Sequence, residues 1–266
     1  MIPLNRYTRR ATLLGFCLGA VGGVNAQVSS INSVVVSPRV YNDVPGATIT
    51  TFTSYPSVVF FNEQNVSQPG GFANRDAWKF SADSGTTPYQ LQHNDYFSAS
   101  MNLTLSGSPI APRKEAGFLF NTANEGDIQF IVNTDGHEVV QFGGISFYSF
   151  SGNNVVSYNS GDSINLGMNY FQDGNGKNAL QFFADGNASP VFEFGPGVGS
   201  GAADIGDGST LGGYFQIVND PNNANNSGSA SFNSLTITPV PEPSTLGLLS
   251  LGAISLGAAV LRRRRG

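Results

Sequence analysis

Between residues 27 and 239, short runs of alternating hydrophobic and polar residues repeat along the chain, separated by Gly, Asn, Asp and Pro. A period of two is typical of a β-strand with one buried face, and the separating residues favour turns. The clearest run is DYFSASMNLTL at residues 95–105, where five apolar residues fall on one side: Phe97, Ala99, Met101, Leu103 and Leu105. No helical period of useful length interrupts this pattern.

Further strands are predicted at residues 127–133, 163–171, 178–184, 211–218 and 229–237. NTDG follows the first of these as a turn into HEVVQFGG, and QDGNGK joins the second and third as a β-hairpin. The polar loop NDPNNANNSG separates the last two. About a dozen strands at this spacing predict an all-β protein, an antiparallel β-sandwich. Residues 28–74 are harder to interpret and are expected to supply edge strands or an extra layer.

The N-terminal segment has the pattern of a secretory signal peptide. Three arginines precede the apolar run ATLLGFCLGAVGGV: Arg6, Arg9 and Arg10. A charged region, a short apolar region and small residues before a cleavage site define such a peptide. We expect cleavage after Ala26, which leaves Gln27 as the first residue of the exported protein. Export through the Sec translocon is favoured over the twin-arginine route, because Thr12 stands where that route has a large apolar residue.

The C-terminal segment, VPEPSTLGLLSLGAISLGAAVLRRRRG at residues 240–266, combines three features in a fixed order. Pro241, Glu242 and Pro243 keep the chain extended, because proline cannot continue a helix. Residues 245–261 carry no charge and predict a transmembrane helix at the lower limit of length. Four arginines then form a basic stop on the cytoplasmic side: Arg262, Arg263, Arg264 and Arg265.

These three features closely resemble the PEP-CTERM sorting signal of bacteria that secrete exopolysaccharide. The resemblance covers about 25 residues and implies recognition by an exosortase, a membrane-embedded processing enzyme, at Pro241-Glu242-Pro243. A plain C-terminal membrane anchor is the alternative. In the sorting interpretation these residues are recognised as part of a substrate, and the tail is a sorting signal that processing removes.

Setting the two ends aside changes the charge of the protein. The whole chain has a net charge of −5, but residues 27–239 hold 6 basic and 17 acidic residues, a net charge of −11. An acidic body is repelled by nucleic acid and excludes that class of ligand. Cys17, the only cysteine, lies in the signal peptide, so the body has neither a disulfide nor a thiolate metal site. A structural calcium ion held by Asp and backbone carbonyl oxygens stays an open alternative.

The body itself resembles the concanavalin A/laminin-G-like jelly roll over residues 75–238. The resemblance rests on the order of FSASMNLTL, KEAGFLFN, GDIQFIVNTDGHEVVQFGG, SGDSINLGMNYFQDGNGKNALQFFADG, GGYFQIVND and SASFNSLTI. KEAGFLFN and QFIVNTDGHEVVQFGG also resemble segments of PEP-CTERM proteins of unassigned activity. Because relatives of this fold include lectins and glycoside hydrolases, the resemblance makes carboxylates and exposed aromatic residues the candidates to examine.

Carboxylates give no catalytic constellation. A retaining glycosidase needs two carboxyl groups about 5–5.5 Å apart. Glu125 and Asp127 share a strand face in EGDIQF, but the second glutamate of the laminarinase pattern E-x-D-x-(x)-E is missing, so an acidic turn entering a strand is favoured. Glu115 and Glu138 are isolated, and each is expected to face solvent or accept a hydrogen bond rather than line a groove. No catalytic residue is assigned.

The sequence also contains no clear pattern of metal-binding or sugar-binding residues. His93 and His137 lack metal-ligand spacing, no G-x-S-x-G occurs, and Lys177 occupies an oxygen-donor position in DGNGK, which indicates a hairpin turn rather than a calcium loop. No cofactor or metal site is assigned. Five aromatic residues are of the types that can stack on a sugar ring, but we expect all of them in the core: Trp78, Tyr89, Tyr148, Tyr158 and Tyr170.

The sequence therefore predicts a signal peptide at 1–26, one β-sandwich domain at 27–239 with a jelly-roll core at about 75–238, and a sorting signal at 240–266. We expect an exported bacterial surface or extracellular-matrix protein, processed by an exosortase and associated with exopolysaccharide without enzymatic activity. A glycoside hydrolase or lyase on the same fold is the main alternative. A purely structural surface protein is the other.

Overall fold

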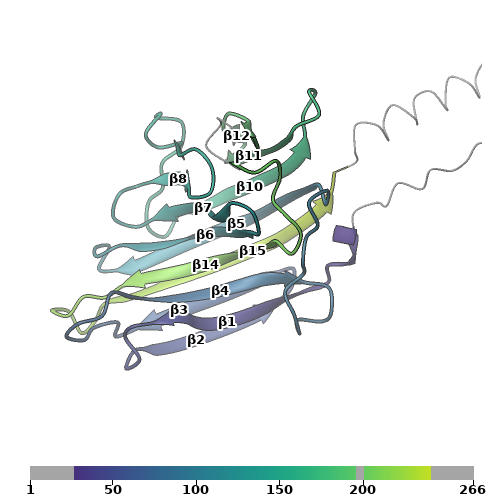
Figure 1. The fold of residues 1–266 in the computed structure, drawn as a ribbon. Coiled ribbons are helices and arrows are strands. Elements are labelled where there is room, and N and C mark those ends of the chain that lie inside the picture. The colour runs from purple at the N-terminus through teal and green to yellow at the C-terminus, as the bar shows by residue number, and fades with distance from the viewer. Residues whose placement is uncertain (1–26, 196–200, 241–266) are drawn as a thin grey trace, which may run out of the picture.

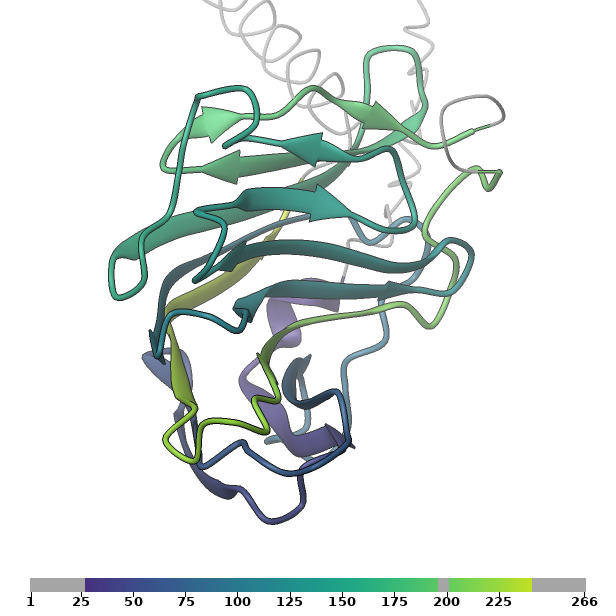
Figure 2. The same ribbon diagram turned by 90° about the vertical axis from the view of Figure 1, so that its left-hand side faces the viewer.

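The computed structural model describes residues 27–195 and 201–240, which form two antiparallel β-sheets packed face to face (Figures 1 and 2). The first sheet has the strand order β1 (Ser33–Asn42), β4 (Ala73–Ser81), β14 (Thr210–Val218), β6 (Lys114–Thr122), β7 (Gly126–Asn133), β8 (Val139–Phe142) and β9 (Tyr148–Ser149). The second has the order β12 (Asn187–Ala188), β11 (Asn178–Ala184), β10 (Ser163–Gln172), β5 (Phe97–Ser108), β15 (Ser227–Pro239), β3 (Val58–Gln64) and β2 (Thr48–Ser54), with β13 (Phe192–Glu193) also paired to β11. One 3₁₀ turn, η1 (Gln27–Ser30), precedes them.

The prediction of an all-β antiparallel sandwich of the jelly-roll kind is confirmed. β5 has the predicted alternation, since all five apolar residues of its first nine are buried: Phe97, Ala99, Met101, Leu103 and Leu105. β10 and β11 pair directly around the predicted hairpin turn. Among the described residues twelve strands are four residues or longer, and β9, β12 and β13 have two each.

A single aromatic-rich core fills the space between the sheets. Trp78 of β4 is fully buried and contacts Phe80 and Phe232, with ring centroids 5.1 and 5.7 Å apart. Edge-to-face pairs of this kind add to the stability gained from area burial. All buried hydrophobic side chains that the structure describes lie between Val28 and Leu235. Residues 27–240 therefore contain the whole core that the structure describes.

Residues 28–74 supply the strands at one side of the sandwich, as Figure 1 shows at its lower edge. β1 ends the first sheet, and the β2–β3 hairpin ends the second. β1 pairs with β4 in two sections, with a register shift between Ser37 and Tyr41. The shift contains Pro38 and Arg39, and Arg39 has a positive φ of 53°. Such a bulge turns the following residues to a new direction.

The predicted sorting signals lie outside the described residues. Within 27–195 and 201–240, no helix is long and apolar enough to cross a membrane. The expected span at 245–261, the motif Pro241-Glu242-Pro243 and the basic stop at 262–265 belong to residues that the structure does not describe, as does Ala26. Gln27 begins η1. These assignments stay predictions.

Candidate functional site

The outer face of the first sheet carries a row of polar side chains across its central strands. The register pairs Gln216 of β14 with Arg75 of β4 on one side and with Glu115 of β6 on the other. Glu115 is in turn paired with Asn133 of β7. Because directly opposite residues of neighbouring strands project to the same face, these four side chains form one polar row. Residues of opposite parity on the same strands, such as Trp78, Phe118 and Phe215, point into the core instead.

Hydrogen bonds link the polar row. Arg75 Nε donates to Gln216 Oε1 at 2.7 Å, and Gln216 Nε2 donates to Glu115 Oε1 at 3.1 Å. The hydroxyl of Tyr214, which is fully buried, donates to the same Glu115 oxygen at 3.0 Å. The guanidinium carbon of Arg75 lies 4.5 Å from the centre of the Tyr214 ring, a cation–π contact. The guanidinium is thus fixed in place by neutral partners.

The next row is apolar, and it fills the middle of this face. It consists of Ala77, Tyr214, Ile131 and Val140 with Gly117 between them, and Leu119 lies alongside. These side chains form a small hydrophobic cluster separate from the main core. Beyond it, Lys79 Nζ donates to Asn121 Oδ1 and to the carbonyl oxygen of Leu119. Within the described residues, Tyr214 is therefore the one titratable side chain in this central row.

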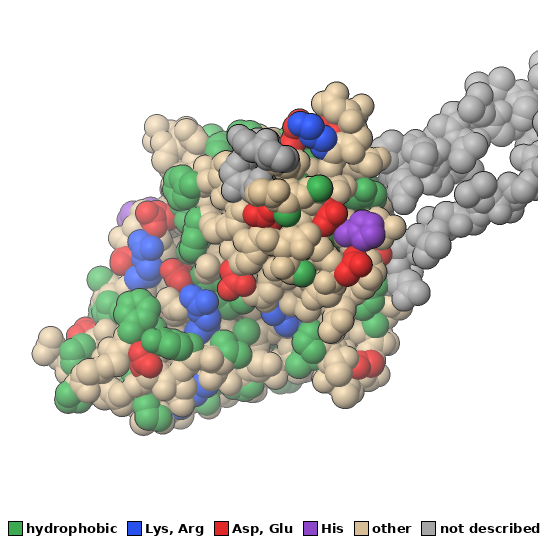
Figure 3. All heavy atoms as spheres, in the orientation of Figure 1, with side chains coloured by type: hydrophobic (Ala, Val, Ile, Leu, Met, Phe, Trp, Pro, Cys, Tyr) green, Lys and Arg blue, Asp and Glu red, His purple; other side chains and the backbone are tan. Residues whose placement is uncertain are grey.

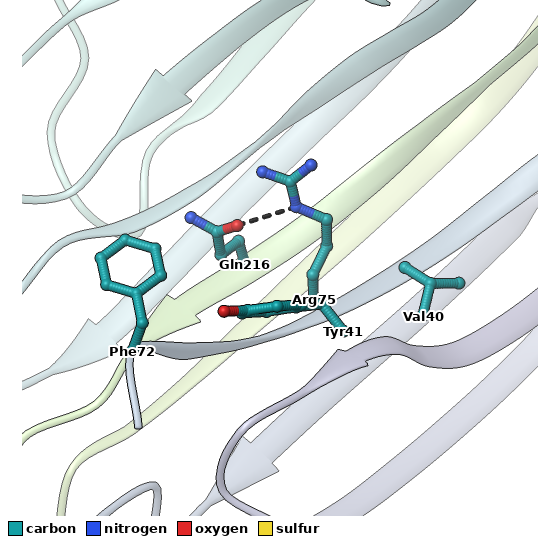
Figure 4. Close-up of a pocket in the computed structure, with 5 residues that line it drawn as sticks. All are labelled: Val40, Tyr41, Phe72, Arg75 and Gln216. Carbon is teal, nitrogen blue, oxygen red and sulfur yellow. Dashed lines mark hydrogen bonds between the residues drawn. The ribbon is translucent and has the colours of Figure 1, made fainter. Parts of the chain in front are cut away.

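A groove of about 370 Å³ opens where the polar row meets the edge of the sheet (Figure 4). It is lined by Val40 and Tyr41 of β1, Phe72 before β4, Arg75 and Gln216. Three of these side chains are largely exposed: Val40 at 55%, Tyr41 at 44% and Phe72 at 57%. Exposed aromatic rings beside planar hydrogen-bonding groups make a surface that an aromatic-stacking, polar ligand can occupy.

Asp43 holds the two aromatic walls of the groove together. Its Oδ2 accepts a hydrogen bond from the Tyr41 hydroxyl at 2.9 Å and from the Phe72 backbone N–H at 2.7 Å. The Phe72 N–H and the Tyr41 hydroxyl together lower the pKa of Asp43. The same contact raises the pKa of Tyr41. Tyr41 therefore stays protonated and Asp43 ionised at neutral pH, which favours this arrangement of the walls.

Arg39 holds the β1 bulge that directs Val40 and Tyr41 into the groove. Its guanidinium forms a double contact with Glu63 of β3, at 3.0 Å from Nε and 3.0 Å from Nη2. Its backbone N–H donates to Asp76 Oδ1 at 2.8 Å, whereas Asp76 Oδ2 has no hydrogen-bond partner among the described residues. Burial raises the pKa of Asp76 to about 7, and the nearby Glu63 adds to the shift. This buried cluster supports the groove from below.

Arg75 places one positive charge in the groove, near the carboxyl groups of Asp43 and Glu115. Arg75 donates only through Nε in the described structure, and it has no carboxylate partner within salt-bridge distance. Burial raises the pKa of Glu115, while its bond from Tyr214 and the charge of Arg75 oppose the shift. Burial raises the pKa of Tyr214 as well. Figure 3 shows basic side chains on this face, set among hydrophobic and acidic ones.

The structure separates the predicted carboxylate candidates. Glu125 lies in the turn before β7 and accepts from the Ala202 N–H at 2.6 Å, and Asp127 accepts from the Asn121 amide. The expected acidic turn entering a strand is confirmed. Glu138 accepts from Arg113 at 2.9 Å at the rim of the sheet. Glu115 does face the outer side, but it is buried and hydrogen-bonded, as expected of a strand residue.

The other sequence candidates have structural roles. Trp78, Tyr158 and Tyr170 are buried in the core, and Tyr89 and Tyr148 pack against it, so the core expectation is confirmed. His93 contacts Asp207 at 2.8 Å on an exposed loop, and the His137 ring contacts the Tyr158 carbonyl oxygen. Asp173 Oδ1 accepts from the Asn175 and Lys177 N–H groups, which confirms the hairpin turn. The described residues hold no cluster of three or more His, Cys, Asp or Glu that suits a metal ion.

Sequence reasoning did not identify the groove residues. Val40, Tyr41 and Phe72 lie in the segment with the weakest pattern, and Arg75 meets Gln216 only through pairing of strands 141 residues apart. One signal was available: Pro38 interrupts the run SVVVSPRVYN, and proline within a strand marks an edge or a bulge.

The protein is a β-sandwich with a groove on one outer face. Comparison with known proteins identifies the C-terminal sorting signal. Residues 239–265 match the PEP-CTERM protein-sorting motif, which confirms that resemblance. The motif implies export, processing by an exosortase and a tail held in the membrane before processing. No curated protein matches the chain.

Solved structures of the same fold class are similar to the chain at low identity. An alginate lyase, AlgAT5 of polysaccharide lyase family 7, is 11% identical with a TM-score of 0.47, covering 79% of this chain and 95% of its own. An alginate lyase from Corynebacterium sp. is 12% identical with a TM-score of 0.47, covering 81% and 99%. The carbohydrate recognition domain of Emp47p is 14% identical with a TM-score of 0.42, covering 77% and 95%.

Proposed function

We propose that this exported, exosortase-processed protein binds an anionic exopolysaccharide through the groove on the first sheet, without cleaving it. The observation that carries the proposal is Arg75, whose guanidinium has no carboxylate partner within salt-bridge distance among the described residues and lines the groove together with the exposed rings of Tyr41 and Phe72. A guanidinium presents a planar fork that matches a carboxylate or sulfate, and aromatic rings stack on the apolar faces of sugars. The processed protein is then a component of the cell surface or extracellular matrix.

Charge supports an anionic rather than a neutral sugar. Residues 27–239 carry only 6 basic residues, and their net charge of −11 repels a polyanion from most of the surface. Arg75, Lys79 and Arg113 nevertheless lie on or at the rim of one face. Neither Arg75 nor Lys79 forms a salt bridge within the described residues. Arg75 is the cation of this face best placed to contact an acidic polymer, because burial lowers the pKa of Lys79 to about 7 and Arg113 is already paired with Asp135 and Glu138.

The interior of the face favours binding over catalysis. General acid–base chemistry needs a positioned acid and base with matched pKa values beside the reacting bond. Apart from Tyr214, the row next to Arg75 consists instead of Ala77, Ile131 and Val140. Glu115, the nearest carboxylate, already accepts two hydrogen bonds at one oxygen. One observation favours the alternative, a polysaccharide lyase or hydrolase: a buried hydroxyl, that of Tyr214, is bonded to a carboxylate beside Arg75.

Binding of residues 27–240 to a panel of neutral, carboxylated and sulfated polysaccharides tests the proposal. Arg75→Gln removes the charge, and loss of charge-assisted hydrogen bonds of about 1.5–3 kcal/mol should weaken anionic binding by roughly 10- to 100-fold. Lys177→Gln is the matched control, because Lys177 is an exposed cation on the distant β10–β11 hairpin. Equal binding by wild type and Arg75→Gln contradicts the groove assignment. Release of new reducing or unsaturated ends would favour the alternative of a hydrolase or lyase. A complete lack of binding would favour a purely structural surface protein.

A further inference from the structure

Strand β2 differs from the other three edges of the sandwich. Within the described residues the sheets end at β1 and β9 in the first sheet and at β12 and β2 in the second. β9 and β12 have two residues each, and β1 carries Pro38 and a register shift. Short strands, prolines and bulges are the devices by which proteins protect sheet edges from further pairing. β2 has seven residues and pairs with β3 without a break.

The chemistry of β2 is that of an unprotected edge. Its sequence, TITTFTS, has no charge and no proline, and six of its seven residues are exposed. Phe52 is 57% exposed, although it carries a large apolar side chain. Residues 44–62 contain no charged residue at all, in a body with 17 acidic residues. Charges, especially lysines, normally mark an exposed edge strand, and none occurs here.

We propose that β2 is a self-association edge, on which a second copy of this chain adds its own β2 in antiparallel orientation. The charge of the protein selects this occupant. Two bodies of net charge −11 repel each other over most surfaces, and the neutral hairpin at 44–62 is where the repulsion is least. A second copy brings a strand of the same length, also uncharged and rich in β-branched residues, to the row of backbone groups that β2 presents.

The pairing register follows from symmetry. All seven residues of β2 pair only when the two strands are centred on Thr51, so that this residue faces its own copy across a two-fold axis. Phe52 then lies opposite Thr50 of the second copy and diagonal to the second Phe52. Because Phe52 is paired with Phe60 inside each molecule, the four rings form one row across the interface. The contact between Phe52 and Thr50 occurs twice, whereas Thr51 meets its own copy once, at the axis.

The mass of residues 27–240 over a range of protein concentrations, measured by light scattering or sedimentation, tests the association. We expect the wild type to reach twice the monomer mass as concentration rises, and Thr51→Lys to stay monomeric, because two lysines would meet at the axis. Asn222→Lys adds the same charge to an exposed loop and should dimerise like the wild type. A wild type that stays monomeric at all concentrations overturns the proposal, as does a Thr51→Lys variant that dimerises normally.

A single introduced cysteine tests the register. Residues 27–240 contain no cysteine, so Thr51→Cys places one thiol at the expected axis. Directly opposite residues of antiparallel strands have Cβ atoms about 4.5–5.5 Å apart, near the range that a disulfide spans. Mild oxidation should convert this variant to a covalent dimer many times faster than Asn222→Cys. Equal rates for the two variants would contradict the β2 pairing, and the glycan proposal would be unaffected by either result.

Discussion

Asp76→Asn should remove a pH dependence of folding stability that originates below the groove. The carboxyl group of Asp76 is fully buried, accepts one hydrogen bond from the Arg39 N–H and leaves Oδ2 without a partner among the described residues. Burial raises its pKa from 3.8 to about 7. An asparagine keeps the acceptor for Arg39 and has no charge to bury.

The direction and size follow from proton linkage. Between pH 4 and pH 7 the folded protein holds a proton on Asp76 that the unfolded chain has released, so the free energy of unfolding falls as pH rises through this window. At 1.36 kcal/mol for each pKa unit, a shift of about three units amounts to roughly 4 kcal/mol, an upper bound that is complete only above pH 7. Asp76→Asn should therefore be nearly neutral at pH 4 and stabilising by up to that amount at pH 8.

Urea denaturation of residues 27–240 at pH 4, 5, 6, 7 and 8 measures the effect. The difference in unfolding free energy between Asp76→Asn and wild type should grow steadily across the series. Asp185→Asn, which removes an exposed carboxylate in the turn after β11, should give a much smaller change with pH. A constant difference for Asp76→Asn at every pH would refute the reasoning, because it would mean that Asp76 stays ionised throughout.

Two further predictions concern the sheet and the tail. Gly212→Ala should cost about 1–3 kcal/mol or more, because its Cβ would lie 1.9 Å from the Trp78 carbonyl oxygen, whereas Gly174→Ala has nothing within 4 Å and should be tolerated; thermal melts of both compare them. Replacing Pro241, Glu242 and Pro243 by alanine should leave an uncleaved, membrane-retained precursor in an exosortase-positive host, and immunoblotting of membrane and medium fractions would show unchanged processing if the sorting interpretation is wrong.

The strands of this fold were predictable where one face of the strand is buried by the sandwich. β5 alternates because its inner residues meet the opposite sheet, and a period of two survives in the sequence. β6 and β14 are buried on both faces by the main core and by the outer apolar cluster, so their runs read as continuous apolar segments. β2 is exposed on nearly every residue and has no hydrophobic alternation to detect.

The groove could not be predicted because its parts come from segments with no local link. Arg75 is charged and sits in a strand between buried neighbours, which a sequence pattern treats as a solvent-facing position. Its role depends on the pairing of β4 with β14 and on the bulge at Arg39, and both are tertiary features. The aromatic residues that sequence type favoured, Trp78 foremost, are large enough to be needed in the core. The two aromatic residues of the groove, Tyr41 and Phe72, were not among them and are held by Asp43.

The two proposals reinforce each other through symmetry. Antiparallel pairing of two β2 strands generates a two-fold axis perpendicular to the second sheet, so both first sheets face the same side of the dimer. The two grooves then open toward one common surface, each lined by β1 residues near the shared edge. A polymer with repeated anionic units can occupy both at once, which raises avidity by orders of magnitude without a new contact, whereas a short oligosaccharide gains nothing. Thr51→Lys separates the two effects: it should weaken binding to the polymer and leave binding to the short fragment unchanged.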